Sequence, residues 1–421
     1  MDNIYCDIAQ KIEKMLDELK QFNSTPHNGI TRLPFTREAK AAADYIEDRM
    51  REAGLFTHQD QSGAVIGRIE GESSKTIIVA SHYDSVMNGG AFDGIAGVVC
   101  GIQIARQLLG EKQRFKYSLE VIATNDEEGA RFKSGFFTTK ALLGKIDINE
   151  LNTLKDSDGV TLYKAMKAYG LVPEALVDAK RDLENILAFM EIHIEQGPVL
   201  EKSSKDIGIV DSIVGIRRSV VTIYGQSDHA GTTPMDMRHD AMEAAAKIIS
   251  KIGDIARQYP KAVATVGSIK ALPDEVNIIC RQVSFSMDIR AEDEEVIAKI
   301  CEQIERVIIE VCKNSDTDFT VENTLSVSPA KMNNVLKRLI EDSCLSKRYS
   351  YMYLNSGAGH DSLEAASSVP TAMLFVPSIN GRSHCKEENT DYKKLAMAAE
   401  IFKDVIKKIN DGDGKNEVSY Y

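Results

Sequence analysis

Residues 81–94 contain side chains whose types and spacing suit metal chemistry. His82, Asp84 and Asp93 stand around a Gly-Gly turn, and the apolar helical pattern of residues 95–109 follows them. We therefore expect His82 at a strand end and Asp93 on the loop that opens a helix, where α/β proteins place their chemistry. An aspartate held there can use both oxygens, as a bridge between two metal ions requires. The plainer alternative is an Asx-turn beside a surface histidine.

An acidic tip follows the next predicted strand. Residues 117–124 have the pattern of a strand and lead directly into Asp126, Glu127 and Glu128. Strand, helix, strand is the crossover unit of a parallel or mixed sheet, so the tip is expected at the same sheet edge as His82. Three adjacent carboxylates repel one another, and alone they would most simply form a solvated turn. Beside a histidine and a further acid they favour a functional site.

Two more histidines stand close to predicted strand ends. In a strand, Glu191, His193 and Glu195 share one face, and a Gly-Pro pair ends that segment. A lone histidine on a strand is more often structural than a ligand, but two flanking carboxylates favour a ligand. His384 lies just beyond the predicted strand of residues 371–376.

Histidines and carboxylates from four distant segments, without cysteine, suit Zn²⁺, Mn²⁺ or Co²⁺. Three imidazoles and two carboxylates fit two ions that share one bridging carboxylate and lie roughly 3.5–4 Å apart. Such a pair lowers the pKa of a water molecule and polarises a carbonyl group, so we expect hydrolysis. Glu127 beside Glu128 is then explained, because one acid binds metal while the other stays free as a general base.

The length, charge and cysteine usage of the chain limit what it can be. With 421 residues it exceeds the usual size of a single core, so two domains are expected. A net charge of −12 argues against nucleic acid or an anionic membrane surface as the main partner and leaves small substrates open. No signal peptide and no membrane span is predicted. The scattered cysteines, with no Cys-x-x-Cys pair, favour a reducing cytoplasm over a disulfide framework or a thiolate zinc site: Cys6, Cys100, Cys280, Cys301, Cys312, Cys344 and Cys385.

The elements that must position these residues fall into two groups. Residues 65–70 and 76–80 are predicted as a hairpin or as neighbouring strands. Around residues 212–215 the pattern changes, and after about residue 328 the first pattern resumes. The stretch between them is predicted as an α+β layer of four strands and two helices: strands 219–224, 262–269, 282–289 and 317–324, and helices 240–255 and 293–312.

Several motifs occur in the order of a known family: His82-x-Asp84, Asn88-Gly89-Gly90-x-x-Asp93-Gly94, Glu127-Glu128-Gly129, His193-Ile194-Glu195-Gln196-Gly197, His229 to Pro234, Ser356 to Asp361 and Ser383-His384. They resemble the dinuclear metal amidohydrolases related to aminoacylases and zinc carboxypeptidases. More narrowly, they resemble the hydantoinase/carbamoylase branch, which contains N-carbamoyl-L-amino acid hydrolases, β-ureidopropionases and allantoate amidohydrolases. The resemblance covers nearly the whole chain.

The resemblance implies an α/β fold with two parts. Residues 1–213 and 328–421 would form a phosphorylase/hydrolase-like catalytic domain with a mixed sheet. Residues 214–327 would form an inserted α+β domain of four strands and two helices, serving as a lid and as the contact of a homodimer.

The resemblance also implies a role for each metal-site residue. His82 and His193 would bind one divalent ion, Glu128 and His384 the other, and Asp93 would bridge them, followed by a cis peptide bond to Gly94. The ions would be Zn²⁺, with Mn²⁺ or Co²⁺ as alternatives. Asp84 would orient the His82 ring. Glu127 would take a proton from the attacking water and deliver it to the leaving nitrogen.

The implied substrate contacts come from both domains. His229 would stabilise the tetrahedral oxyanion, commonly in the site of the partner subunit. Asn277 and Arg290 would hold the substrate carboxylate, and Gln196 would contact the ureido group. The other implied substrate-binding positions are Arg217, Gly357 and His360.

The substrate expected first is an N-carbamoyl-L-amino acid, because residues 126–132 and 196–201 resemble carbamoylases. Allantoate is the second expectation, because residues 215–218 with their paired arginine and residues 375–381 resemble the allantoate type. A dipeptidase or aminoacylase is a third enzyme reading. A binding protein without catalysis would lack one of the metal-binding residues or the general base, and the sequence contains all of them.

Overall fold

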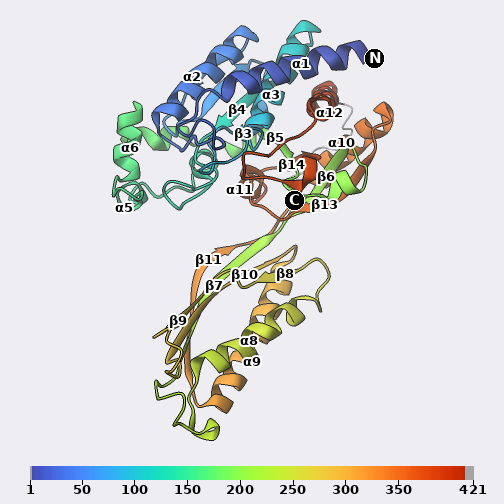
Figure 1. The fold of residues 1–421 in the computed structure, drawn as a ribbon. Coiled ribbons are helices and arrows are strands. Elements are labelled where there is room, and N and C mark those ends of the chain that lie inside the picture. Colours follow the sequence, from blue (N-terminus) through green and yellow to red (C-terminus); the bar gives the residue numbers. More distant parts are fainter. Residues whose placement is uncertain (1, 413–421) are drawn as a thin grey trace. The chain divides into compact units, whose positions relative to one another are not determined.

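The computed structural model describes residues 2–412, which divide into two units (Figure 1). Unit 1 is formed by the chain up to Asp211 and from Lys331 onward, and unit 2 by Ser212–Ala330. The sequence predicted the insertion at residues 214–327. Within residues 2–412, no helix combines the length and apolar character needed to cross a bilayer.

Unit 1 is built on a nine-stranded mixed sheet with strand order β1-β2-β4-β3-β5-β14-β6-β12, in which β13 also pairs with β6. Its strands are β1 Phe56–Gln59, β2 Val65–Ile69, β3 Ser73–His82, β4 Tyr117–Thr124, β5 Ile186–Ile194, β6 Ile207–Ile213, β12 Ala330–Lys331, β13 Tyr351–Ser356 and β14 Thr371–Val376. The four central strands β4, β3, β5 and β14 run parallel to one another. They are apolar and almost wholly buried, as strands covered on both faces must be.

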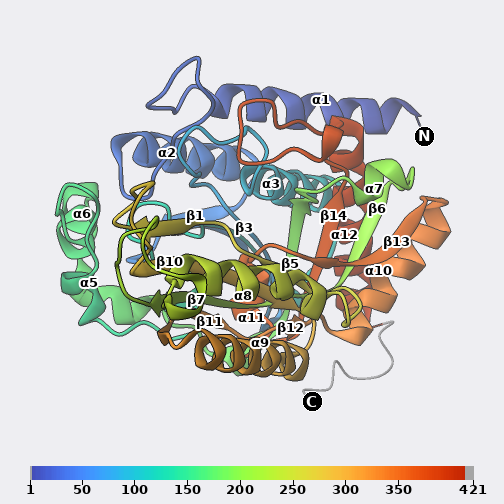
Figure 2. The same ribbon diagram turned by 60° about the horizontal axis from the view of Figure 1, so that its bottom comes forward.

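Helices cover both faces of this sheet. The helices of unit 1 are α1 Asp2–Leu19, α2 Arg37–Glu52, α3 Ile95–Gly110, α4 Phe137–Leu142, α5 Glu150–Thr153, α6 Leu162–Tyr169, α7 Val199–Lys202, α10 Asn334–Lys347, α11 Asp361–Ala365 and α12 Tyr392–Asp411, with short 3₁₀ turns η1 Pro173–Ala179, η2 Leu183–Asn185 and η4 Ile379–Gly381. Helices α1, α3 and α12 pack against one another (Figure 2). Ile77 and Val79 of β3 belong to the core on the α3 side, whereas Ile78 and Ala80 belong to a second core with residues of α4 and α11.

The predicted hairpin of residues 65–70 and 76–80 is wrong, because β4 lies between β2 and β3. It pairs antiparallel with β2 and parallel with β3. The chain leaves β2 by passing close over the start of β4. A Cβ at Gly71 would lie 2.4 Å from the carbonyl carbon of Tyr117, and the Gly71 N–H donates to Ser118 Oγ at 3.1 Å.

Unit 2 has a five-stranded antiparallel sheet, where the sequence predicted four strands. The elements are β7 Gly215–Tyr224, β8 Val263–Thr265, β9 Ile269–Leu272, β10 Gln282–Ala291, β11 Asp318–Val327, α8 Ala241–Ala256, α9 Glu294–Ser315 and the 3₁₀ turn η3 Met235–Met237. Helices α8 and α9 lie along one face of the long strands (Figure 1).

The predicted strand 262–269 is two short strands, β8 and β9, that pair with successive parts of β10. Residues 266–268 lie opposite residues 286–287, so three residues face two and the ladder breaks, as at a β-bulge. The break is held by Ser286 Oγ, which accepts the N–H of Ser268 at 3.0 Å.

A matched pair of glycines in α3 tests how this helix meets the sheet. A Cβ at Gly97 would lie 2.2 Å from the carbonyl oxygen of Ile192, whereas a Cβ at Gly110 would have no neighbour within 4 Å. We predict that Gly97→Ala destabilises unit 1 by about 1–3 kcal/mol through overpacking. Gly110→Ala should be neutral or stabilise by about 0.5–1 kcal/mol through helix propensity. The check is the thermal unfolding midpoint of each metal-free protein, and equal midpoints would contradict this account of α3.

Candidate functional site

The carboxyl ends of four central strands bring the candidate residues together in unit 1. Strand β3 ends at His82, β4 runs into the acidic tip, β5 carries His193 next to its last residue, and the loop after β14 carries His384. These strands are parallel, so the four ends meet at one edge of the sheet. The predicted placement of the acidic tip beside His82 is confirmed by the parallel pairing of β3 with β4.

Asp93 lies at the centre of this edge, with a different set of neighbours at each carboxylate oxygen. Its Oδ1 is 3.1 Å from His193 Nε2 and 3.6 Å from His82 Nε2. Its Oδ2 is 2.9 Å from His384 Nε2, which in turn lies 3.5 Å from Glu128 Oε1. The five residues therefore form two groups with metal-ligand spacing, His82–Asp93–His193 and Asp93–Glu128–His384, which have Asp93 in common.

The two buried imidazoles present their Nε2 atoms to Asp93. His82 Nδ1 is 3.1 Å from the backbone oxygen of Asp84, and His193 Nδ1 is 2.9 Å from the backbone oxygen of Ile194. A carbonyl can only accept, so each Nδ1 carries a hydrogen, and in the neutral ring the Nε2 lone pair is then available to a cation. The N–H of Gly94 points at His193 Nε2 at 3.2 Å, which agrees with that assignment.

The site concentrates negative charge. Burial opposes ionisation of Asp93, but its contacts with His193 and His384 and the nearby His82 ring outweigh burial and hold the pKa of Asp93 well below its ordinary value. The hydrogen bond to Asp93, opposed by burial and aided by Glu128, raises the pKa of His384 to about 9. Without another cation, the carboxylates draw protons onto the imidazoles. A bound divalent ion would supply the same positive charge.

The Asp84 carboxylate was predicted to orient the His82 ring, but in the structure it holds the acidic tip instead. The Asp84 carboxylate accepts the N–H groups of Glu127 at 3.1 Å and Glu128 at 3.3 Å. Its nearer oxygen lies 3.7 Å from His82 Nδ1, beyond hydrogen-bond distance, and the backbone oxygen takes that place. Asp84 therefore orients the two glutamates through its side chain and His82 through its main chain.

Glu127 lies beside the first group. Among the described residues, none donates a hydrogen bond to its carboxylate. Its Oε2 is 3.8 Å from His82 Nε2, and only 7% of the residue is exposed. Burial, partly opposed by His82 and reinforced by Glu128, raises the pKa of Glu127 well above its ordinary value. A carboxyl with a raised pKa is suited to taking up a proton and returning it.

Residues behind His193 fix its ring. His360 packs edge-on against it with ring centroids 4.5 Å apart, and Ser356 Oγ is 2.8 Å from His360 Nε2. Glu191 accepts the N–H of Ser362 at 2.9 Å and its Oγ–H at 2.7 Å. His360 is 1% exposed, whereas Gly357 is exposed with open space beside it. Of these two predicted substrate positions, only Gly357 reaches the surface.

Gln196 joins the second group. Its Nε2 donates to Asp93 Oδ2 at 3.1 Å and lies 3.2 Å from His384 Nε2, and its Oε1 is buried with no hydrogen-bond partner. Glu195, predicted on the same face as His193, instead accepts the N–H groups of Val199 and Leu200 at the start of α7.

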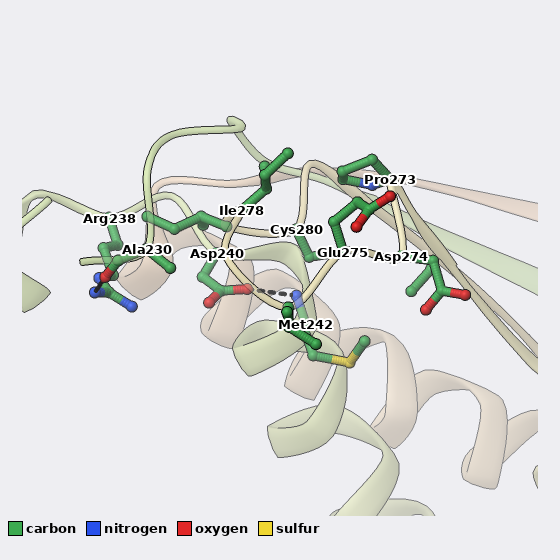
Figure 3. A pocket seen from close by; sticks show the side chains of 12 residues that line it. Ala230, Arg238, Asp240, Met242, Pro273, Asp274, Glu275, Ile278 and Cys280 are labelled. Atoms are coloured by element: carbon green, nitrogen blue, oxygen red, sulfur yellow. Dashed lines mark hydrogen bonds between the residues drawn. The ribbon is translucent and has the colours of Figure 1, made fainter. Parts of the chain in front are cut away.

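The predicted residues of unit 2 form two separate pairs. His229 and Ile278 form an isolated antiparallel bridge, which places Asn277 beside the His229 loop, and Figure 3 shows the pocket next to this bridge, lined by Ala230, Arg238 and Ile278 among others. This pair lies beyond the end of the sheet where Tyr224 faces Gln282.

Arg217 and Arg290 lie at the other end of the same strands, where Ile289 faces Arg217. Arg290 donates to both oxygens of Asp288, and Arg217 donates to Ser326 and Glu294. Arg290 lies eight positions after Gln282 along β10, which is roughly 26 Å at about 3.3 Å per residue. A small carboxylate therefore cannot contact Asn277 and Arg290 of one unit 2 together.

Two further points differ from the sequence analysis. The cis peptide bond expected after Asp93 is absent, because within residues 2–412 the cis bond is Leu272–Pro273. Glu388, which was not predicted as a site residue, is buried and hydrogen-bonded to the loops of both Asp93 and His384. The signal available was the pair of adjacent glutamates Glu387 and Glu388, three and four residues after His384.

The residues present fit divalent cations. They are imidazoles and carboxylates, the ligand set of zinc and manganese sites, and their donor atoms lie within 4.8 Å of one another in each group. Glu128 Oε1 is buried without a hydrogen-bond partner, and a cation in the second group would bind this oxygen instead.

Comparisons with known proteins agree with this geometry. Residues 78–408 match the model of peptidase family M20/M25/M40. The chain is 38% identical to an N-carbamoyl-L-amino-acid amidohydrolase of Paenarthrobacter aurescens, over 96% of this chain and 98% of that protein. It is 34% identical to the allantoate amidohydrolase of Escherichia coli strain K12, over 92% and 94%. A solved structure of a hydantoinase/carbamoylase family amidase from Burkholderia multivorans superposes with a TM-score of 0.88 at 29% identity, covering 96% of this chain and 98% of that one.

The metal-ligand spacing around Asp93, the two-unit α/β fold and the match over most of the chain lead to one conclusion. The chain belongs to peptidase family M20/M25/M40, whose members are metal-dependent hydrolases, and its relatives there are amidohydrolases of carbamoyl and ureide C–N bonds.

Proposed function

We propose that this protein hydrolyses the ureido C–N bond of an N-carbamoyl-L-amino acid. Water adds to the carbamoyl carbon, the bond to the amino-acid nitrogen breaks, and the free amino acid, carbon dioxide and ammonia result. The observation that carries the proposal is the Asp93 carboxylate between two ligand groups, with Glu127 beside it. Relatives named as N-carbamoyl-L-amino acid amidohydrolases, at 34–38% identity, support this substrate.

Two divalent cations per subunit are part of the proposal, with Zn²⁺ first and Mn²⁺ or Co²⁺ as alternatives. His82 and His193 would hold one ion, Glu128 and His384 the other, and Asp93 both. Bound there, the ions would lower the pKa of a water molecule and polarise the carbamoyl carbonyl.

Glu127 and Gln196 would handle the protons and the ureido group. Glu127 takes a proton from the attacking water and returns it to the leaving nitrogen, which its raised pKa supports. The Oε1 of Gln196, which has no hydrogen-bond partner, accepts an N–H of the carbamoyl group. Without this acceptor, the substrate N–H would lose its hydrogen bond to water on binding and gain none in return.

His229 would donate a hydrogen bond to the developing oxyanion. The N–H of Gly231 donates to His229 Nδ1 at 3.0 Å, so a neutral His229 ring carries its hydrogen on Nε2. The ring is solvent-exposed, which leaves that hydrogen free to reach a substrate. A preset donor of this kind stabilises charge in the transition state more than in the ground state.

The separation of Asn277 from Arg290 supports a homodimer. If both residues contact one substrate carboxylate, they must come from different subunits, since the length of β10 from Gln282 to Arg290, roughly 26 Å, lies between them in one chain. We propose that Asn277 and His229 enter the site from the partner subunit, while Arg290 and the Asp93 groups belong to the same chain. Arg217, Gly357 and the buried His360 would shape that pocket.

Allantoate is the second candidate substrate. The chain is 34% identical to one allantoate amidohydrolase and 32% identical to another, from Bacillus subtilis strain 168. The paired arginines resemble that type, although Arg218 is bonded to Asp288 and Arg217 to Glu294 within unit 2. We also propose the cytoplasm as the place of action, supported by three cysteines buried as thiols, Cys100, Cys312 and Cys344.

The product profile tests the proposed function. The Zn²⁺- or Mn²⁺-loaded protein is offered N-carbamoyl-L-amino acids, β-ureidopropionate, allantoate and a set of dipeptides separately, and products are identified by mass spectrometry. We expect free amino acid from the N-carbamoyl compounds. Ammonia with ureidoglycine or ureidoglycolate from allantoate alone would replace the first candidate by the second. Turnover of no substrate by a fully metallated protein would contradict both.

Glu127→Gln tests the assigned base. The variant keeps the size of the side chain but cannot take up the proton, so we expect normal metal content and a rate lowered by about 10²–10⁴-fold. Steady-state kinetics with metal analysis check this. Glu47→Gln on α2 serves as the control, because Glu47 is a half-buried glutamate that pairs with Arg51. Wild-type rates in Glu127→Gln would rule out its role as the base.

Heterodimers of inactive variants test the subunit assignment. One chain carries His229→Ala and the other carries Glu127→Gln or Arg290→Ala, and differently tagged chains are purified together. Each such heterodimer has one complete site, so about half of the wild-type activity should return.

The control heterodimer combines His229→Ala with Asn277→Ala. Both residues come from the same end of one unit 2, so each site lacks one of them and activity should stay absent. Rescue in this control, or none in the first two heterodimers once their formation is shown, would contradict the assignment.

A further inference from the structure

The buried Glu388 carboxylate joins two loops that lie almost three hundred residues apart in the sequence. Its Oε1 accepts the N–H groups of Phe92 at 2.9 Å and Asp93 at 3.0 Å. Its Oε2 accepts the Oγ–H of Ser383 at 2.7 Å and the N–H of His384 at 3.3 Å. One side chain thus binds the main chain of the shared ligand Asp93 and of the second-group ligand His384.

The space around Glu388 is closely matched to it. A Cβ at Gly90 would lie 2.0 Å from both Cδ and Oε1 of Glu388, a distance that real atoms do not adopt. Gly90 does not have a left-handed φ, so a glycine is needed here for room and not for backbone conformation. The position of the Glu388 carboxylate is therefore restricted by its hydrogen bonds to the two loops and by its close packing against Gly90.

The two ligand groups depend on different supports. His82 and His193 stand on β3 and β5, which are hydrogen-bonded neighbours in the centre of the sheet. His384 stands on a loop, and 47% of its side chain is exposed. Nothing in the sheet fixes the 2.9 Å distance between His384 Nε2 and Asp93 Oδ2, so that distance must be set by contacts between the loops.

We propose that Glu388 is a positioning residue that sets the spacing of Asp93 and His384 and thereby the affinity of the second cation position. This inference rests on the two-ion site proposed above. The Glu388 side chain contacts the main chain of Asp93 and His384 and not the side-chain atoms that would bind metal. Residues that orient metal ligands in this way typically change metal affinity by about 10–100-fold when they are replaced.

Glu388→Gln tests the inference, because it keeps the size of the side chain but turns an N–H₂ group toward one pair of N–H or O–H donors. Mn²⁺ binding to the full-length, metal-stripped chain is measured by calorimetric titration. We expect one site of wild-type affinity and a second site weakened by about 10–100-fold. The control is Glu387→Gln, the exposed neighbour that pairs with Arg382, and it should bind as wild type.

Two other variants keep the test decisive if Glu388→Gln folds poorly. Gly90→Ala should displace the Glu388 carboxylate and weaken the same site, and Ser383→Ala removes one of its four hydrogen bonds and should do so less. Two sites of unchanged affinity in these variants, or equal weakening of both sites, would overturn the inference. A wild-type chain that binds one ion would instead refute the two-ion proposal.

Discussion

The Asp93 carboxylate is the point on which the site depends. One oxygen faces two imidazoles from the sheet and the other faces an imidazole on a loop, so each ligand group is incomplete without it. The pKa of Asp93 stays well below its ordinary value although burial opposes ionisation, because three imidazoles lie close around its carboxylate. Such a buried charge persists only when its surroundings are fixed, and the main chain at Asp93 is fixed by Glu388.

The sheet and the loops share the task of placing that charge. Parallel pairing of β4, β3, β5 and β14 brings four strand ends to one edge, and the close approach of α3 at Gly97 fixes the loop that carries Asp93. Asp84 then draws the two glutamates toward the site through their N–H groups. The long strands of unit 2 keep its two pairs of candidate residues apart, so a site that used all of them would need two subunits.

Much of this was predictable from the sequence, and the failures have physical causes. Residue types and strand-end positions predicted that His82, Asp93, His193, His384 and the acidic tip with Glu128 lie together, and the structure brings them to one edge of the sheet. This part was predictable because strand, helix, strand connections have few possible arrangements. The strand order was mispredicted at β2 and β3, since local pattern does not say which strand comes between two others. The split of β8 from β9 depends on a bulge opposite β10, and the role of Glu388 depends on contacts between distant loops. Neither leaves a local pattern.

The most direct test of the account is the metal content of the Asp93→Ala protein. Bound metal per chain is measured by mass spectrometry after equilibration with Zn²⁺ and dialysis, beside the wild type and His384→Ala. If Asp93 is the ligand common to both groups, the wild type holds two ions, His384→Ala holds one, and Asp93→Ala holds neither at wild-type affinity. An Asp93→Ala protein that still binds two ions as tightly as the wild type would contradict the account.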